Sequence, residues 1–258
     1  MSIEKLISAW MVDYLTEELP AHTRRIPLDP GRLSDQLQPG DVLLVEGRTR
    51  ISQVIMYLTQ SSWSHASMYV GDALLRWGGA AAEAALERWG PEARQLLVES
   101  DLKEGVIAVP LRKYADYNLR ICRPHALTGE SLERVLSELF RHLGLRYDRR
   151  NVLDLARYLI PFHLLPRALR RRPLYLGRSD SREVICSALL AKAFYKADFP
   201  IQPLGTAAAP AGRVPVQRHP SYIMPRDFAL SPYFEVHKAS LPACAPYGAW
   251  RSGSSQKG

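Results

Sequence analysis

The sequence is short of the residues on which disulfide-bonded and metal-binding proteins depend. It contains three cysteines, Cys122, Cys186 and Cys244, with no CxxC pair and no histidine at zinc-like spacing. We therefore expect neither a disulfide framework nor a metal site, and at least one free thiol. A Gly-rich loop followed by lysine is also missing, so no nucleotide phosphate site and no cofactor are expected.

Long apolar runs are missing as well. No segment approaches the roughly 18 apolar residues of a membrane-spanning helix. Residues 1–19 interleave charged with apolar residues, unlike a signal peptide. These features predict a cytoplasmic protein. The 47% hydrophobic and 23% charged residues are those of an ordinary globular protein, and the length predicts one domain with insertions.

The charge is strongly positive, at +8, and arginines gather at 167–172 directly after an apolar stretch at 153–165. This combination suits an anionic membrane surface or an acyl groove. A core helix with a solvated basic end is the alternative. No zinc finger, helix-turn-helix or basic-aromatic motif accompanies the arginines, which argues against nucleic acid as a partner.

Local patterns predict an α+β fold in which helices cover an antiparallel sheet. Apolar residues at helical spacing predict helices at 1–19, 51–59, 128–143 and 184–195. Short β-prone runs predict strands at 41–46, 67–70, 96–99, 105–109 and 118–123. Residues 73–95 have a helix-favouring composition and interrupt the sheet as an insertion. From about residue 200 proline and glycine dominate, and the chain ends in a tail that we expect to be disordered.

The chemistry of the sequence centres on Cys186 and His65. Cys186 lies in the first turn of a predicted helix, where the partial positive charge of the helix N-terminus lowers the pKa of a thiol. A thiolate nucleophile needs a base that a third polar group orients. Among seven histidines, His65 is the best candidate because it begins a β-prone run. The alternatives are a buried, unreactive Cys186 and a structural His65.

The order of several short motifs resembles a known family. The motifs are 37–44 (LQPGDVLL), 63–72 (WSHASMYVGD), 98–99 (VE) with 105–107 (GVI), 144–148 (GLRYD) and 185–188 (ICSA). Together they resemble the permuted NlpC-type papain-like cysteine hydrolases, the YiiX/YebB-like group, which is related to lecithin retinol acyltransferase. In this group the histidine precedes the cysteine, as it does here. Tyr147 and Asp148 in the fourth motif are interpreted as structural.

The resemblance implies a circularly permuted papain-like fold with Cys186 as nucleophile, His65 as base and Glu99 as the third residue. A surface carboxylate at the end of a strand is the alternative for Glu99. The insertion departs from the shorter turn expected in the family, so the third residue could instead lie nearer His65. Tyr69, Trp63 and Ser187 are candidate substrate-binding residues, and Tyr69 is alternatively a core aromatic.

We therefore expect a cysteine hydrolase or acyltransferase acting on an amide or ester of a peptide or lipid acyl substrate. The expected units are an N-terminal helix and linker at 1–36, a catalytic domain at 37–240 with the insertion near 73–95, and a tail at 241–258. A catalytically silent papain-like module and a basic protein that binds polyanions or membrane surfaces are the alternatives.

Overall fold

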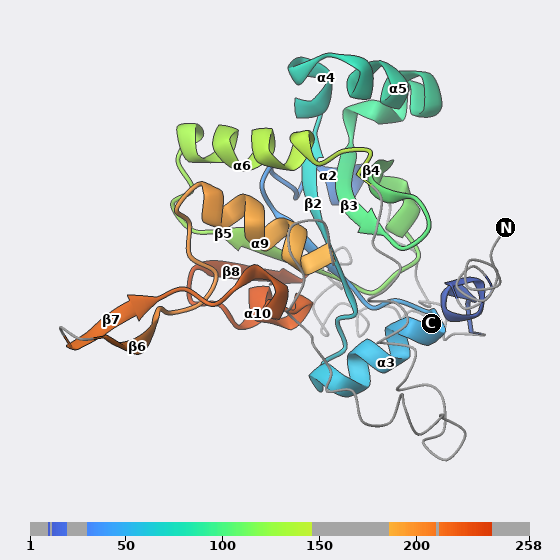
Figure 1. Cartoon of the computed structure of the whole chain (residues 1–258). Coiled ribbons are helices and arrows are strands. Elements are labelled where there is room, and N and C mark those ends of the chain that lie inside the picture. Colours follow the sequence, from blue (N-terminus) through green and yellow to red (C-terminus); the bar gives the residue numbers. More distant parts are fainter. Residues whose placement is uncertain (1–9, 11, 20–29, 146–185, 210–211, 239–258) are drawn as a thin grey trace, which may run out of the picture.

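A six-stranded antiparallel sheet forms the centre of the molecule (Figure 1). The computed structural model describes residues 10, 12–19, 30–145, 186–209 and 212–238. The strand order is β4-β3-β2-β1-β5-β8. The strands are β1 (Val42–Val45), β2 (His65–Gly71), β3 (Leu96–Asp101), β4 (Gly105–Pro110), β5 (Leu119–Pro124) and β8 (Phe234–Lys238). The predicted α+β class with an antiparallel sheet and packed helices is confirmed.

Helices fill most connections between the strands and cover the sheet. Their bounds are α2 (Pro30–Ser34), α3 (Arg50–Thr59), α4 (Ala73–Trp77), α5 (Ala80–Trp89), α6 (Gly129–Arg141), α9 (Cys186–Lys196) and α10 (Pro225–Leu230). Three short 3-10 turns are η1 (Gly90–Arg94), η2 (Leu111–Tyr114) and η4 (Pro220–Tyr222). Residues 10 and 12–16 are also helical, and β6 (Gly205–Ala209) pairs with β7 (Gly212–Val216) as a separate hairpin.

Local sequence explains where the main helices begin. The hydroxyl of Thr49 accepts a hydrogen bond from the N–H of Ser52 at the start of α3. The hydroxyl of Thr128 does the same for the N–H of Ser131 at the start of α6. Such side chains satisfy an N–H that has no partner within the helix. The helix that the sequence predicts at 128–143 is confirmed, with Thr128 as its cap.

The sheet carries a hydrophobic core on each face. One core joins Leu44, Met68 and Val98 to the apolar sides of α5, α6, α9 and α10. The other joins alternate strand residues, Leu43 and Leu97 among them, to α2 and η2. Since successive strand residues point to opposite faces, these two sets follow directly from the strand register. Figure 1 shows α6 and α9 lying together across the first face.

The sheet opens at one end, between β2 and β3. Both strands continue past the pair Met68–Val98, β2 back to His65 and β3 on to Asp101, but their pairing stops at that pair. The N–H of Ala66 is thus left for another acceptor, and it bonds to the sulfur of Cys186 at the start of α9. The opening is therefore where a residue from one face of the sheet can meet a residue from the other.

The structure agrees with the predicted elements up to residue 200 and adds helices and strands after it. Strands and helices lie at all the predicted positions that it describes in the first two thirds, and 73–95 forms α4, α5 and η1. The part after residue 200, for which the sequence analysis named no helix or strand, contributes β8 to the sheet beside β5. Here Phe228 of α10 and Phe234 of β8 pack onto Phe194 of α9.

Several predictions fall outside the described residues. They concern Tyr147 and Asp148, the apolar and arginine-rich stretch at 153–172, and the tail at 241–258. Within the described ranges, the helices are too short or too polar to cross a membrane.

Candidate active site

Cys186 is the first residue of α9 and lies in the opening of the sheet. Its side chain is 8% exposed, and the rest of α9 packs into the core through residues such as Leu189 and Leu190. The sulfur accepts backbone hydrogen bonds from the N–H groups of Ala66 and Ser187. These donors and the partial positive charge of the helix N-terminus together stabilise the thiolate form of Cys186.

His65 begins β2 and lies between Cys186 and Glu99. Its Nε2 is 3.1 Å from Oε2 of Glu99, and its side chain is 22% exposed. A second side-chain hydrogen bond joins the ring to Cys186. Because Nε2 is used by Glu99, Nδ1 is the ring nitrogen left for the sulfur. The imidazole is therefore held by hydrogen bonds at both nitrogens while part of its side chain remains exposed.

Glu99 lies on β3, 1% exposed, and three side chains hold its carboxylate. Nζ of Lys113 is 2.5 Å from Oε1, and the hydroxyl of Tyr114 donates to Oε2 at 2.5 Å. The third partner is His65. The helical insertion returns the chain to β3 in a register that brings Glu99 to the histidine. The structure thus brings together Cys186, His65 and Glu99, the three residues predicted from the sequence.

The pKa values follow from this arrangement. Burial alone would lower the pKa of His65, but the negative charge and hydrogen bond of Cys186, joined by Glu99, raise it to about 10. Burial would raise the pKa of Cys186, and the charge and hydrogen bond of His65 with the two backbone donors lower it below its usual range. Burial is likewise outweighed at Glu99, where His65 and Lys113 bring the pKa to about 2. The favoured neutral-pH state is a thiolate beside an imidazolium.

Glu99 is expected to make the fold sensitive to acid. Its folded pKa of about 2 lies below the ordinary 4.5, so its contribution to stability is complete above pH 4.5 and is lost as the pH falls towards 2. A shift of this size corresponds to on the order of 3 kcal/mol of unfolding free energy. Urea unfolding at pH 6 and at pH 2.5 should show a larger loss in the wild type than in Glu99→Gln.

The matched control for this measurement is Glu104→Gln. Glu104 is a half-exposed carboxylate at the turn into β4 that pairs with Arg88 at 2.9 Å. This variant should lose as much stability in acid as the wild type. An equal acid loss in Glu99→Gln would contradict the burial of a charged Glu99.

The three candidate substrate-binding residues have different surroundings. Tyr69 is 6% exposed and lies in the second core among leucines and valines, away from the sulfur. Ser187 is fully buried, and its hydroxyl donates to the carbonyl of Ile223 at 2.6 Å, so only its N–H reaches the sulfur. Both side chains are therefore enclosed by protein, and their role in substrate binding stays a prediction. Trp63 is half-buried two residues before His65, under the guanidinium of Arg120.

Lys113 and Tyr114 belong to the site but were not found from the sequence. They lie on η2, the turn after β4, and reach Glu99 only because this turn folds back over β3. The ring of Tyr114 also lies 6.1 Å from the ring of His65. No spacing in the sequence indicates such a contact, since it depends on the path of the chain after a strand.

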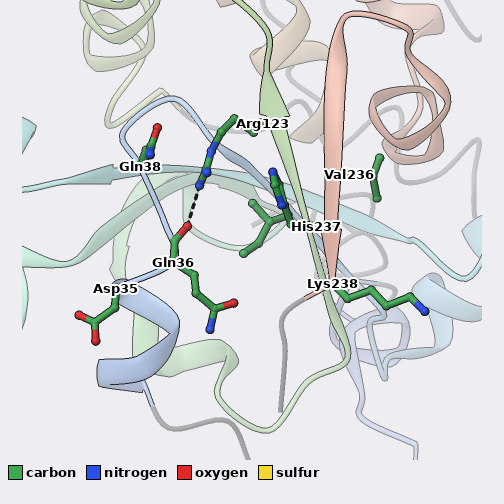
Figure 2. A pocket seen from close by; sticks show the side chains of 8 residues that line it. Asp35, Gln36, Gln38, Arg123, Val236, His237 and Lys238 are labelled. Atoms are coloured by element: carbon green, nitrogen blue, oxygen red, sulfur yellow. Dashed lines mark hydrogen bonds between the residues drawn. The ribbon is translucent and has the colours of Figure 1, made fainter. Parts of the chain in front are cut away.

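A separate pocket of about 510 Å³ lies at the β5–β8 edge of the sheet (Figure 2). Residues around it include Gln36, Arg123, His237 and, at the sheet edge, Lys238. Arg123 is already bound there, because its guanidinium pairs with the buried carboxylate of Asp41 at 2.7 Å and donates to the carbonyl of Gln36. The pocket is polar, and none of the three residues of the Cys186 site lines it.

Metal ligands do not gather anywhere in the parts of the chain that the structure describes. Within those ranges there is no group of three or more histidine, cysteine, aspartate or glutamate side chains placed to hold an ion.

Comparisons with known proteins found one family match and a similar crystal structure. Residues 36–158 match a family model described as permuted papain-like amidase enzyme, YaeF/YiiX, C92 family. A crystal structure described as metalloprotein yiiX from Escherichia coli O157:H7 is similar at 16% identity and a TM-score of 0.48. That similarity covers 80% of this chain and 99% of the other. No curated protein matches the chain.

Proposed function

We propose that this chain, whose residues 36–158 belong to the permuted papain-like amidase family, hydrolyses amide bonds with Cys186 as nucleophile. The family resemblance seen in the sequence is confirmed by that match, which contains His65 and Glu99 and ends before Cys186. The observation that carries the proposal is the chain of side-chain hydrogen bonds from Cys186 through His65 to Glu99.

The first half of the reaction is acyl transfer to sulfur. The thiolate of Cys186 attacks the amide carbonyl carbon, and the C=O electrons move onto oxygen. The N–H of Cys186, at the start of α9, is a donor for that oxyanion. As the carbonyl re-forms, the C–N bond breaks, and the imidazolium of His65 gives its proton to the leaving amine. The products of this step are a free amine, a thioester and a neutral His65.

The second half restores the enzyme. Neutral His65 takes a proton from water, and the resulting hydroxide equivalent attacks the thioester carbonyl. The C–S bond then breaks to give a carboxylic acid, and the thiolate–imidazolium pair re-forms. An amine or alcohol in place of water would make the same residues an acyltransferase. The described residues do not favour that outcome or a lipid acyl substrate, so both remain predictions.

Glu99 serves this cycle by position and charge. Its carboxylate accepts from Nε2 of His65 and so directs Nδ1 towards the sulfur. Lys113 and Tyr114 keep the carboxylate in place and favour its ionised form. The Cys186 thiolate, the His65 imidazolium and the Glu99 carboxylate are each hydrogen-bonded to a neighbour in this set. The site therefore favours an enzyme over a catalytically silent module.

Thiol reactivity tests the proposal without a known substrate. Iodoacetamide alkylation, followed by mass spectrometry from pH 5 to 10, should modify Cys186 with an apparent pKa well below the usual value of about 8.5. In His65→Ala the apparent pKa should rise to that value or above, because the positive charge is gone while burial remains. Cys122 is the internal control, since burial raises the pKa of its thiol to about 12. A Cys186 no more reactive than Cys122 would reject the proposed nucleophile.

A further inference from the structure

Two cationic residues, Arg120 and Lys238, are backbone neighbours across β5 and β8 on the α9 side of the sheet. Arg120 on β5 is directly opposite Lys238 on β8. Residues that face each other on antiparallel strands share a face, and like charges in that arrangement destabilise the sheet. Arg120 is also opposite Leu44, which belongs to the core beneath α9, so both cations start on that face. In Figure 2, Lys238 leaves β8 on the side away from His237.

No carboxylate neutralises this pair within the described ranges. Arg120 lies over the ring of Trp63, with its guanidinium carbon 4.8 Å from the ring centroid, and Lys238 is exposed. The nearest acid by register is Glu46, two residues after Leu44. Its carboxylate instead accepts from the side-chain amide of Asn118 at 2.8 Å. Among the residues that the structure describes, neither cation forms an ion pair with a carboxylate.

Arg120 lies within reach of the nucleophile, and Lys238 is one strand further away. Ala66, whose N–H binds the sulfur of Cys186, is opposite Leu44 on β1, and Arg120 is the next residue across. Two strand spacings of about 4.8 Å place the Arg120 backbone roughly 10 Å from that of Ala66. This span corresponds to about three extended residues of a bound chain. Trp63, two residues before His65, lies under the guanidinium.

We propose that Arg120 and Lys238, with Trp63 as the platform, bind an anionic group of the substrate. The substrate class is then an amide that carries a carboxylate or a phosphate about three residue lengths from the bond to be cleaved. Arg120 supplies a planar, bidentate donor, which the ring of Trp63 holds in orientation, and Lys238 adds a second charge. The inference rests on the proposed function, because it takes Cys186 as the reacting atom.

Charged and neutral alkylating probes test this inference. The probes are N-iodoacetyl-diglycine with a free carboxylate, its C-terminal amide, and N-iodoacetyl-phosphoethanolamine with its dephosphorylated form. In each, the thiolate displaces iodide, and the readout is the ratio of anionic to neutral alkylation rates at Cys186. We expect a ratio of about ten in the wild type for at least one anion, the size of one charge-assisted hydrogen bond. In Arg120→Gln with Lys238→Gln it should fall to about one.

The matched control is Arg88→Gln, which removes the same charge from α5, where Arg88 pairs with Glu104. It should keep the wild-type ratio. A wild-type ratio near one for both anions, or a ratio that Arg88→Gln lowers equally, would overturn the subsite while the nucleophile stands. Whichever anion gives the larger ratio identifies the group that is bound.

If Cys186 did not react with any probe, the proposed nucleophile would be rejected. The anion subsite would then be tested separately by measuring ligand binding. N-acetyl-diglycine and phosphoethanolamine should each be titrated against the intrinsic tryptophan fluorescence of the wild type and of Trp63→Phe. A saturable change that is lost in Trp63→Phe supports the subsite. No such change would overturn it.

Discussion

Cys186→Ala is expected to lower amide hydrolysis by about 10³-fold or more, because the variant has no atom that can form the acyl intermediate. Single-turnover assays on an anilide substrate with a terminal carboxylate would measure the loss. The fold should survive, since Cys186 contributes only its first-turn position to a helix that the core holds through Leu190 and Phe194.

The control for this variant is Cys122→Ala. Cys122 is fully buried on β5, and its thiol stays protonated because burial raises its pKa to about 12. Removing it should change stability but not the rate per folded molecule. If Cys122→Ala lost activity and Cys186→Ala kept it, Cys122 and not Cys186 would be the nucleophile.

Glu99→Gln is expected to lower kcat by about 10² to 10⁴-fold, the range seen when the carboxylate that orients a catalytic histidine is neutralised. The pH profile of kcat/KM should also narrow from both sides. Without the negative charge, the pKa of His65 falls from about 10 towards 6.5, so the alkaline limb moves to lower pH. A less charged His65 supports the thiolate less, so the acid limb set by Cys186 moves to higher pH.

This pattern separates a charge effect from general damage to the fold. Glu104→Gln, an exposed change on the neighbouring strand connection, should keep both limbs in place. If Glu99→Gln lost activity with unchanged pH limits, the carboxylate would matter for packing and not for the charge of His65.

The parts of the fold found from sequence are those with local signals. Strands β1 to β5 carry apolar residues on at least one face, and α6 is marked by Thr128 and by apolar residues at helical spacing. By contrast, β8 buries only Phe234 strongly, while Glu235, Val236 and Lys238 are exposed. Such an edge strand is held by its pairing with β5, which no local pattern reveals.

The part of the site that could be predicted from sequence lies at the start of a helix and the start of a strand. Cys186 at a helix start and His65 at a strand start are local features, and the family resemblance added Glu99. Lys113, Tyr114 and Arg120 were missed because each acts across the fold, from a turn or from another strand. Ser187 was named as a candidate substrate-binding residue, but its hydroxyl donates to the carbonyl of Ile223, which lies in a segment for which the sequence predicted no element.

The distance in sequence between the two halves of the site affects the newly made protein. His65 and Glu99 leave the ribosome before Cys186, which follows Glu99 by 87 residues; at about 5 to 20 residues per second this is a delay of roughly 4 to 17 s. Until β2 and β3 are in place to receive it, Cys186 lacks the partners that lower its pKa. The nascent chain therefore carries an ordinary thiol at Cys186. Its nucleophilic reactivity appears only after α9 has packed against β2 and β3.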